Sequence, residues 1–471
     1  MKLELQPHRP HAFTYVTVFV TMIVVGIMLA AYLKLVSVQN QLTARSQNWN
    51  RAVPIIEAGI EEALAHLNKN GSPDASGNFT LANLTGEGWT SASTTGPWTK
   101  YGSLDGDIYV VQIDQWTGTT TNFPFINATG YVKQVEAFAL NRPFGPFVAT
   151  LLDDLSSGQY SRRVVQCTTT NVPTFTKALV AKRGIDMNGN GVFTDSFDSS
   201  NPAYSTNKRW DWAKHRDNGD IASNDTVTNA INIQNANIWG RVSTGPYGTV
   251  SVGSQGSVGD AAWQTAGNRG IKPGFSTDDM NMEIPDVVIP NVTWSAMPSG
   301  GSGYSYIFNQ ANGNYRMPVG SGDVSGKILV AAPNVQLLVQ SGWTFSGQNS
   351  LTIASNASIK IYLDCASADI TGQGIINNNP GGFSTADQCY IFGTSKLTTL
   401  SMGGNGESTC VLYVPYANVT FHGGGHSDQD FSGAAVVNSI KLNGHYSFHY
   451  DEALGRRGLW RGFVVTSWNE K

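Results

Sequence analysis

An apolar run near the N-terminus constrains this chain more than any other feature. Residues Phe13–Val36 are almost entirely apolar, and Lys34 is the only charged residue among them. At 1.5 Å of rise per residue, a helix of this length spans roughly 30 Å of hydrocarbon. The apolar core of a cleaved secretory signal is shorter, at about 7–15 residues. The sequence therefore predicts a transmembrane segment at residues 13–36, preceded by a short tail at residues 1–12.

Positive residues flank this run on both sides, with Lys2 and Arg9 before it and Arg45 and Arg51 after it. The positive-inside rule therefore does not fix the orientation. Only 14% of the residues are charged, against about a quarter in ordinary globular proteins. The part after the run is weakly charged and rich in Ser, Thr and Asn, so we expect it to be exported. The predicted location is the inner membrane, crossed once, with the C-terminal domain in the periplasm or at the cell surface.

An amphipathic helix is predicted to continue the anchor over residues 37–69. Its apolar residues recur at steps of three and four, which places them on one face of a helix. Pro54 is expected to kink this helix, and Asn70-Gly71 is expected to end it. The apolar face consists of Ile56, Ile60, Ala63, Leu64 and Leu67.

The segment Ser46–Asn68, which follows an apolar run opening with Phe13-Thr14, resembles the N-terminal helix of PilX-like minor pilins. The motifs Glu57-Ala58-Gly59 and Glu61-Glu62-Ala63 carry this resemblance. It implies pilin-like or other envelope protein subunits as partners. Processed pilins have Gly before the Phe and major pilins have Glu five positions into the mature chain, whereas this chain has Ala12 and Thr17. Processing of the N-terminus and membership of a filament therefore stay open.

Strand-like runs with alternating β-branched residues follow at Asp107–Ile113, Gly130–Val135 and Arg163–Thr169. A sheet made of these strands would cover the apolar face of the amphipathic helix. We therefore predict a small pilin-like α+β head at residues 70–182.

A loop region with a candidate calcium-binding turn is predicted at residues 183–230. The segment Asp186–Gly191 matches the start of a calcium loop, in which alternate residues present oxygen ligands and Gly makes the turn. The twelfth position is Phe197 rather than a bidentate Glu, and a plain Asn-Gly turn is the alternative. No cofactor is certain from the sequence, and the ion that this turn suggests is a structural calcium. The candidate ligands are Asp186, Asn188, Asn190, Val192, Asp195 and Asp198.

Short β runs separated by Gly, Asn and Ser turns fill residues 231–471. Cys365, Cys389 and Cys410 are 24 and 21 residues apart, which is about one coil of a β-solenoid. Equivalent residues of successive coils stack about 4.8 Å apart, so these cysteines could form a ladder. The sequence therefore predicts a mainly β protein with a C-terminal right-handed parallel β-helix at residues 231–471, and a β-sandwich is the alternative. Any disulfide pairing among these cysteines and Cys167 stays open.

The C-terminal segments Asp430–Ala434, Lys441–Leu454 and Val464–Glu470 carry a second resemblance. They are similar to the C-terminal domain of uncharacterised bacterial exported proteins, which join a pilin-like N-terminus to a polymer-forming or β-solenoid body. This resemblance implies a structural or surface role.

Four histidines lie within 28 residues near the C-terminus, and they could form a metal site with neighbouring carboxylates. On a strand, however, an i,i+4 pair of histidines lies about 13 Å apart, so an adjacent coil would have to contribute. Asp428 and Asp430 would share one face of a strand and could supply an acid and a base for glycoside hydrolysis. The histidines are His422, His426, His445 and His449.

No nucleophile elbow, zincin or phosphate-loop motif is present, and we expect no enzyme activity. A net charge of −4 disfavours a nucleic-acid partner. The predicted function is that of a membrane-anchored, minor pilin-like structural protein of the bacterial cell envelope, whose β-helix body serves assembly or adhesion, with surface glycans as further candidate partners. The alternative is a β-helix polysaccharide hydrolase or lyase.

Overall fold

The computed structural model divides the chain into two compact units, which we describe separately. The anchor unit comprises residues 1–72, 79–171 and 462–471, and the parallel unit comprises residues 73–78 and 172–461. Most of the predicted tail and residues 70–83 lie outside the described residues. The structure describes residues 11–69, 84–91, 96–114, 123–133, 160–189, 191–376, 378–379, 382–383, 385–404, 406–423, 430–457 and 459–471.

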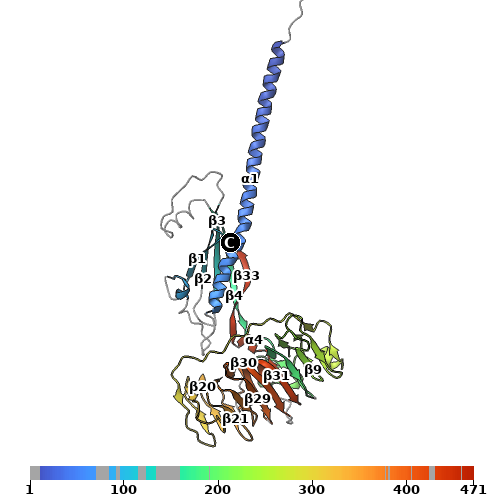
Figure 1. The fold of residues 1–471 in the computed structure, drawn as a ribbon, viewed down its shortest axis with the longest axis vertical. Helices are drawn as coiled ribbons and strands as arrows, with labels where there is room; N and C mark the ends of the chain where they lie inside the picture. Colours follow the sequence, from blue (N-terminus) through green and yellow to red (C-terminus); the bar gives the residue numbers. More distant parts are fainter. Residues whose placement is uncertain are drawn as a thin grey trace, which may run out of the picture. The chain divides into compact units, whose positions relative to one another are not determined.

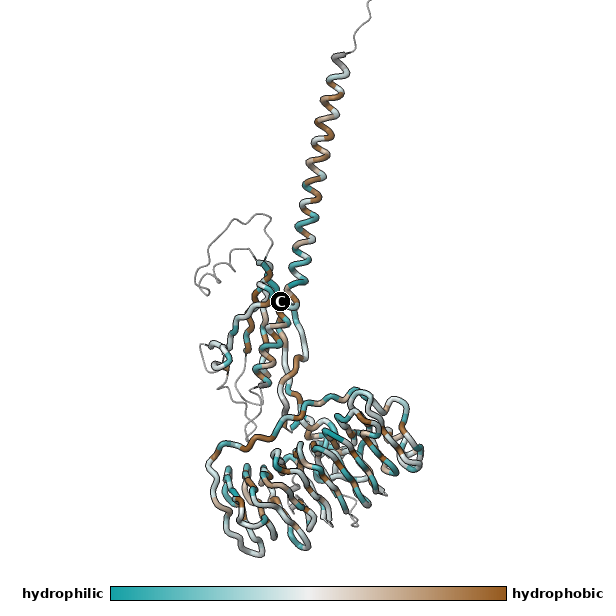
Figure 2. Tube along the Cα trace, in the orientation of Figure 1, coloured by the Kyte–Doolittle hydropathy of each residue, from teal (hydrophilic) through white to brown (hydrophobic). Residues whose placement is uncertain are grey.

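A single helix, α1 (His11–Lys69), forms the N-terminal part of the anchor unit (Figure 1). Its apolar side chains from Tyr15 to Leu35 are exposed, and Figure 2 shows how apolar residues dominate this part of the helix. Among the described residues, this is the one helix long and apolar enough to cross a membrane. The predicted transmembrane and amphipathic segments are thus one continuous element, with Pro54 inside it.

The C-terminal part of α1 packs on an antiparallel sheet in the strand order β1-β2-β3-β4-β33. The predicted runs Asp107–Ile113 and Arg163–Thr169 fall on strands of this sheet, and so do residues 130–133 of the third run, whose residues 134–135 lie outside the described residues. The last strand, β33, comes from the C-terminus of the chain and lies next to β4. The strands are β1 (Trp98–Leu104), β2 (Asp107–Asp114), β3 (Phe125–Lys133), β4 (Tyr160–Pro173) and β33 (Trp460–Glu470).

The helix and the sheet fit closely because a glycine lies beneath the helix. Ile56 is fully buried, and a Cβ atom added to Gly130 of β3 would lie 2.9 Å from Ile56 Cγ1 and 3.0 Å from the Ala52 carbonyl oxygen. Any side chain at position 130 would therefore push the helix away from the sheet.

Side chains also tie β33 to the rest of the anchor unit. The Asn68 side chain accepts a hydrogen bond from the Phe463 N–H (2.7 Å) and donates one to the Phe463 carbonyl (3.2 Å). Arg163 on β4 forms an ion pair with Glu470 (2.9 Å), and the Lys471 N–H donates to the Val164 carbonyl (3.0 Å). The last ten residues of the chain therefore complete this unit.

The parallel unit contains a sheet of 26 strands. Its cross-strand pairings are parallel, and many of them join segments about 20–30 residues apart in sequence, for example Leu351 with Ile375 and Ile361 with Ile391. Parallel pairing of this kind does not fit the antiparallel β-sandwich. A separate antiparallel pair consists of β26 (Asn378–Asn379) and β27 (Gly382–Phe383).

The strands of the parallel unit fall into two groups along the chain. The first group, which we call the N-half, consists of β5 (Leu179–Ala181), β6 (Ile185–Met187), β7 (Phe193–Phe197), β8 (Ile221–Ser223), β9 (Ile231–Gln234), β10 (Asn237–Trp239), β11 (Val242–Ser243), β12 (Val250–Val252), β13 (Ser257–Gly259), β14 (Gly270–Ile271) and β15 (Ser276–Thr277). The second group, the C-half, consists of β16 (Ser295–Ala296), β17 (Tyr306–Phe308), β18 (Asn314–Met317), β19 (Lys327–Val330), β20 (Val335–Val339), β21 (Trp343–Phe345), β22 (Ser350–Ile353), β23 (Ile359–Leu363), β24 (Ser367–Ile370), β25 (Ile375–Ile376), β28 (Cys389–Gly393), β29 (Thr399–Gly404), β30 (Ser408–Gly423), β31 (Phe431–Gly444) and β32 (Ser447–Asp451).

Short helical turns accompany these strands and do not interrupt the sheets. They are η2 (Thr85–Glu87) in the anchor unit and, in the parallel unit, η3 (Trp212–Lys214), α3 (Ala261–Thr265), η4 (Ala386–Gln388) and α4 (Leu454–Arg457).

The strands do not stack in the order of the sequence. The first strands, β5 and β6, pair with β8 and β9 on one side and with β31 on the other, and β7 pairs with β10 and β32. The end of the C-half therefore stacks on the beginning of the N-half, in the middle of the sheet. We call this junction, between β31–β32 and β5–β7, the seam. The two chain segments that lead into and out of the unit also meet, since the Thr174 N–H donates to the Leu459 carbonyl (2.7 Å).

Two of the sequence-based boundaries differ from the structure. Residues 183–230, predicted as a loop region, contain β6, β7 and β8, and the parallel sheet already begins at Leu179. These strands are only three to five residues long, which is too short for a clear alternation of apolar and polar residues. Residues 462–471, predicted as part of the solenoid, belong to the anchor unit.

Replacing Ile56 with Ala should destabilise the packing of α1 on β2 and β3. Loss of a fully buried Ile side chain costs about 2–5 kcal/mol, so amide hydrogen exchange in β2 and β3 should accelerate in the full chain in detergent. The control is Glu57→Ala, since Glu57 is exposed on the same helix. Equal exchange in the two variants would contradict the packing described here.

Candidate functional site

Polar and charged side chains gather at the seam, where residues 195–218 meet residues 447–457. We call these side chains the seam cluster. They come from β7 and the segment after it, and from β32, the turn after it and α4. Parallel pairing positions the first contact, because His449 on β32 lies in register with Asp195 on β7.

The Asp195 carboxylate is fully buried and binds three side chains. His449 Nδ1 lies 2.5 Å from Oδ1, His215 Nδ1 lies 3.0 Å from Oδ2, and Trp210 Nε1 donates to Oδ2 at 2.8 Å. Burial by itself raises the pKa of Asp195, but His449 and the hydrogen bonds from these partners outweigh burial and hold that pKa below its ordinary value. Asp195 is therefore an ionised acceptor at neutral pH.

Aromatic rings cover this carboxylate. The Trp210 ring stacks on His449 with centroids 3.9 Å apart, and His215 lies 4.4 Å from both Trp212 and Trp239. Such contacts stabilise a ring in place and exclude water from the carboxylate.

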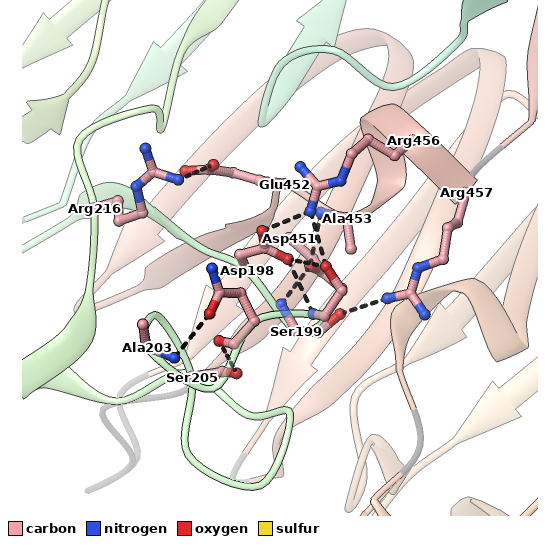
Figure 3. Close-up of polar contacts among 12 residues, drawn as sticks. Asp198, Ser199, Ala203, Ser205, Arg216, Asp451, Glu452, Ala453, Arg456 and Arg457 are labelled. Carbon is pink, nitrogen blue, oxygen red and sulfur yellow. Dashed lines mark hydrogen bonds and ion pairs between the residues drawn. The ribbon is translucent and has the colours of Figure 1, made fainter.

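A second part of the seam cluster surrounds Asp198 and Asp451 (Figure 3). Arg456 Nη2 lies 2.5 Å from Asp198 Oδ2, and Asp451 Oδ1 accepts hydrogen bonds from the Ser199 N–H (3.0 Å) and the Ala453 N–H (3.1 Å). These bonds tie the turn after β7 to the turn after β32.

The pKa values of these two acids move in opposite directions. Burial raises the pKa of Asp451 to about 6, although hydrogen bonds from Ser199 and Ala453 oppose this shift. Burial also acts to raise the pKa of Asp198, but its bonds to Ser200 and Arg456 outweigh burial and lower that pKa.

Two further ion pairs extend the seam cluster. Arg216 pairs with Glu452 (2.7 Å), as Figure 3 shows, and Arg209 pairs with Glu407, which directly precedes β30. Burial raises the pKa of Glu407, while Arg209 and His449 act to lower it.

The candidate calcium ligands have different protein partners. Asp186 accepts a hydrogen bond from Asn232 (3.1 Å), the Asn188 N–H donates to the Leu442 carbonyl (2.9 Å), and Val192 is buried. Asp195 and Asp198 bind the histidines and the arginine described above. Asn190 lies outside the described residues, and the calcium site stays a prediction.

The four clustered histidines do not share one environment. His422 lies on β30, level with Asn443, and His449 belongs to the seam cluster, whereas His426 and Asp428 lie outside the described residues. Asp430 accepts a hydrogen bond from the Ser447 N–H (2.8 Å). Within the described part of the chain, no three His, Cys, Asp or Glu side chains form a group that could hold a metal ion.

All four cysteines are free thiols and buried. Cys389 and Cys410 directly precede the in-register pair Tyr390–Val411, so they lie on adjacent strands as the predicted ladder requires. Cys365 does not continue this ladder. Leu363, two residues before Cys365, is level with Gly393, which already lies four residues after Cys389.

Sequence reasoning selected Asp195 and His449 separately, for different proposed sites, and missed His215, Trp210 and Arg456. The contact between Asp195 and His449 joins residues 254 positions apart. Only the register of strand pairing at the seam could have shown that these residues meet, and the sequence did not predict that register.

Comparisons with known proteins give little further information. The model of a domain of unknown function, DUF7305, matches residues 320–457, which include β32 and its side of the seam cluster. No curated protein matches this chain. Among solved structures, the competence-associated pilin ComZ from Thermus thermophilus is similar at 9% identity, over 90% of this chain and 98% of that chain, with a TM-score of 0.27. At this TM-score the similarity carries no argument about fold or function.

Replacing Asp451 with Asn should stabilise the parallel unit at neutral pH. A carboxyl group whose pKa is raised to about 6 in the folded state disfavours folding progressively as pH rises from about 4 to above 6. Each pKa unit corresponds to about 1.4 kcal/mol, so the variant should gain on the order of 2–3 kcal/mol at pH 7.5 and almost nothing at pH 4. Urea unfolding at both pH values measures this, with the exposed Asp278→Asn as control. An equal loss of stability at both pH values would show that the ionised carboxylate supports the fold.

The four thiols should be unreactive in the folded protein. Burial raises the pKa of Cys167 to about 11 and raises the pKa of the other three thiols, and only the thiolate reacts. A thiol reagent at pH 7.5 should therefore detect none in the native chain and four in denaturant, while an added exposed cysteine, Ser276→Cys, should react in both. Fewer than four thiols in denaturant would reveal a disulfide and contradict the structure.

Proposed function

We propose that this chain is a membrane-anchored, pilin-like structural protein of the bacterial cell envelope. The supporting observation is the division of α1 into two parts. Its residues from Tyr15 to Leu35 expose apolar side chains, and its residues from Ala52 to Leu67 bury them against an antiparallel sheet. The first part is suited to spanning the hydrocarbon of a membrane, and the second part is suited to packing in a folded head. A pilin-like subunit is expected to use its N-terminal helix in these two ways.

We interpret the parallel unit as a right-handed parallel β-helix that serves as the body of the protein. Its support is the repeated parallel pairing at intervals of about 20–30 residues, which is the pattern of a solenoid. This body is inserted into the chain between β4 and β33 of the head sheet.

We place the contacts of this protein on two surfaces. On α1, exposed apolar residues continue beyond the anchor as Val38, Leu42 and Trp49, and they could pack against helices of pilin-like or other envelope subunits. For the body we propose adhesive contacts with envelope proteins or surface glycans, in keeping with the low share of charged residues in the chain, 14%. The role we propose is structural rather than enzymatic.

Mass spectrometry of the intact chain, isolated from membranes that have been washed at alkaline pH, tests this proposal. We expect the protein to remain in the washed membranes, because an apolar helix of this length partitions into the bilayer. A chain that begins at Phe13, above all with a methylated N-terminus, would support assembly in a pilus-type system. A chain that retains residues 1–12 would limit the pilin resemblance to the helix, and release from the membrane by the wash would overturn the proposal.

A further inference from the structure

An extended segment of 17 residues, 278–294, joins the two halves of the parallel unit, and we call it the strap. It contains no strand or helix. Figure 1 shows it as the yellow-green connection that runs along the stacked strands. Connections of this length without secondary structure are uncommon in compact domains and usually have a function.

The strap must run the length of the stack, because the halves are stacked out of sequence order. A single ladder leads from Ser295 to Ser276 in ten steps from strand to strand. At about 4.8 Å per step, this distance is about 48 Å. A fully extended chain from Thr277 to Ser295 reaches roughly 60 Å. The strap is therefore close to its full extension and has little slack.

The strap is fastened to both halves within a few residues. Met282 lies on the N-half, where its N–H donates to Asn224 Oδ1 (3.0 Å) and its carbonyl accepts from Asn224 Nδ2 (2.6 Å). Only three residues later, the Pro285 carbonyl accepts a hydrogen bond from the Tyr413 hydroxyl of the C-half (2.7 Å). Ile284, between these two contacts, is buried. The strap thus crosses the seam between Met282 and Pro285.

Side chains of both halves meet the strap at this crossing. The Tyr416 hydroxyl of the C-half donates to Asp286 Oδ1 of the strap (2.5 Å), and Lys182 of the N-half lies over the Tyr416 ring at 4.3 Å. Strap, N-half and C-half are therefore joined in one continuous set of contacts.

We propose that the strap is a fastener of the seam, so that its release opens the seam while each half keeps its own fold. Within each half, most successive strands are connected by short turns, and the longest fully described connection, residues 198–220 between β7 and β8, is tied back to β7 by the hydrogen bond from the Arg216 N–H to the Ser196 carbonyl (2.7 Å). At the seam no short turn connects the two sides, and pairing there carries the larger cost of closing a long loop. The strap, crossing the seam under near-full extension, holds the two sides at the separation that pairing requires.

Hydrogen exchange of the full chain in detergent tests this proposal. The double variant Met282→Asp with Ile284→Asp removes the two buried strap side chains, which are 7% and 9% exposed, and the control Val288→Asp changes a strap residue that is 76% exposed. We expect at least about tenfold faster exchange of the seam amides of Lys182, Arg183 and Ile440, which donate across the seam. Exchange in β20 and β23, inside the C-half, should not change.

Two outcomes would overturn the proposal. Unchanged exchange at the seam would show that the strap only covers the surface beneath it. Equal acceleration at the seam and in β20 and β23 would show that the unit opens as a whole. A milder variant, Asn224→Ala, removes only the two hydrogen bonds to Met282 and should give a smaller acceleration confined to the seam; acceleration elsewhere would count against the proposal.

Discussion

The parallel unit depends on the pairing of β31 and β32 with β5, β6 and β7. Inner residues of the first strands, such as Leu179 and Ile185, are buried, and the last strands of the unit pair with and cover the edge of these first strands. An uncovered sheet edge presents unpaired N–H and C=O groups and is a site for unwanted pairing. The polar contacts of the seam cluster and the crossing of the strap both lie at this same junction. Strand pairing, the buried charged side chains of the seam cluster and the strap thus all join the two halves at the seam.

The out-of-order stacking also explains how a large body can be inserted into a small sheet. A solenoid that stacks in sequence order has its two ends at opposite ends of the stack, which here would be about 48 Å apart. In this chain the first and last strands are neighbours at the seam. The connections at Thr174 and Leu459 are consequently hydrogen-bonded to each other, and they can continue into the adjacent strands β4 and β33.

The sequence predicted those features that depend on local patterns. The apolar face of the amphipathic helix is confirmed, since Ile56, Ile60 and Leu67 are buried, because a period of 3.6 residues is visible within a few turns. The strands of the N-half were partly missed, because strands of two to five residues carry too little alternation. The seam cluster was beyond reach, because residues such as Asp195 and His449 are brought together by a pairing between distant strands. Strand β33 was assigned to the wrong unit for the same reason.

The position of β33 has a consequence for biosynthesis. The strand that completes the head sheet, β33, follows the whole inserted body in the sequence and is therefore synthesised after it. A chain that stops anywhere within the body leaves β4 as an open edge and the Asn68 side chain without its contact to Phe463. The head sheet is therefore completed only in chains that extend through the inserted body to β33, and shorter products expose an open strand edge of the kind that pairs with other chains.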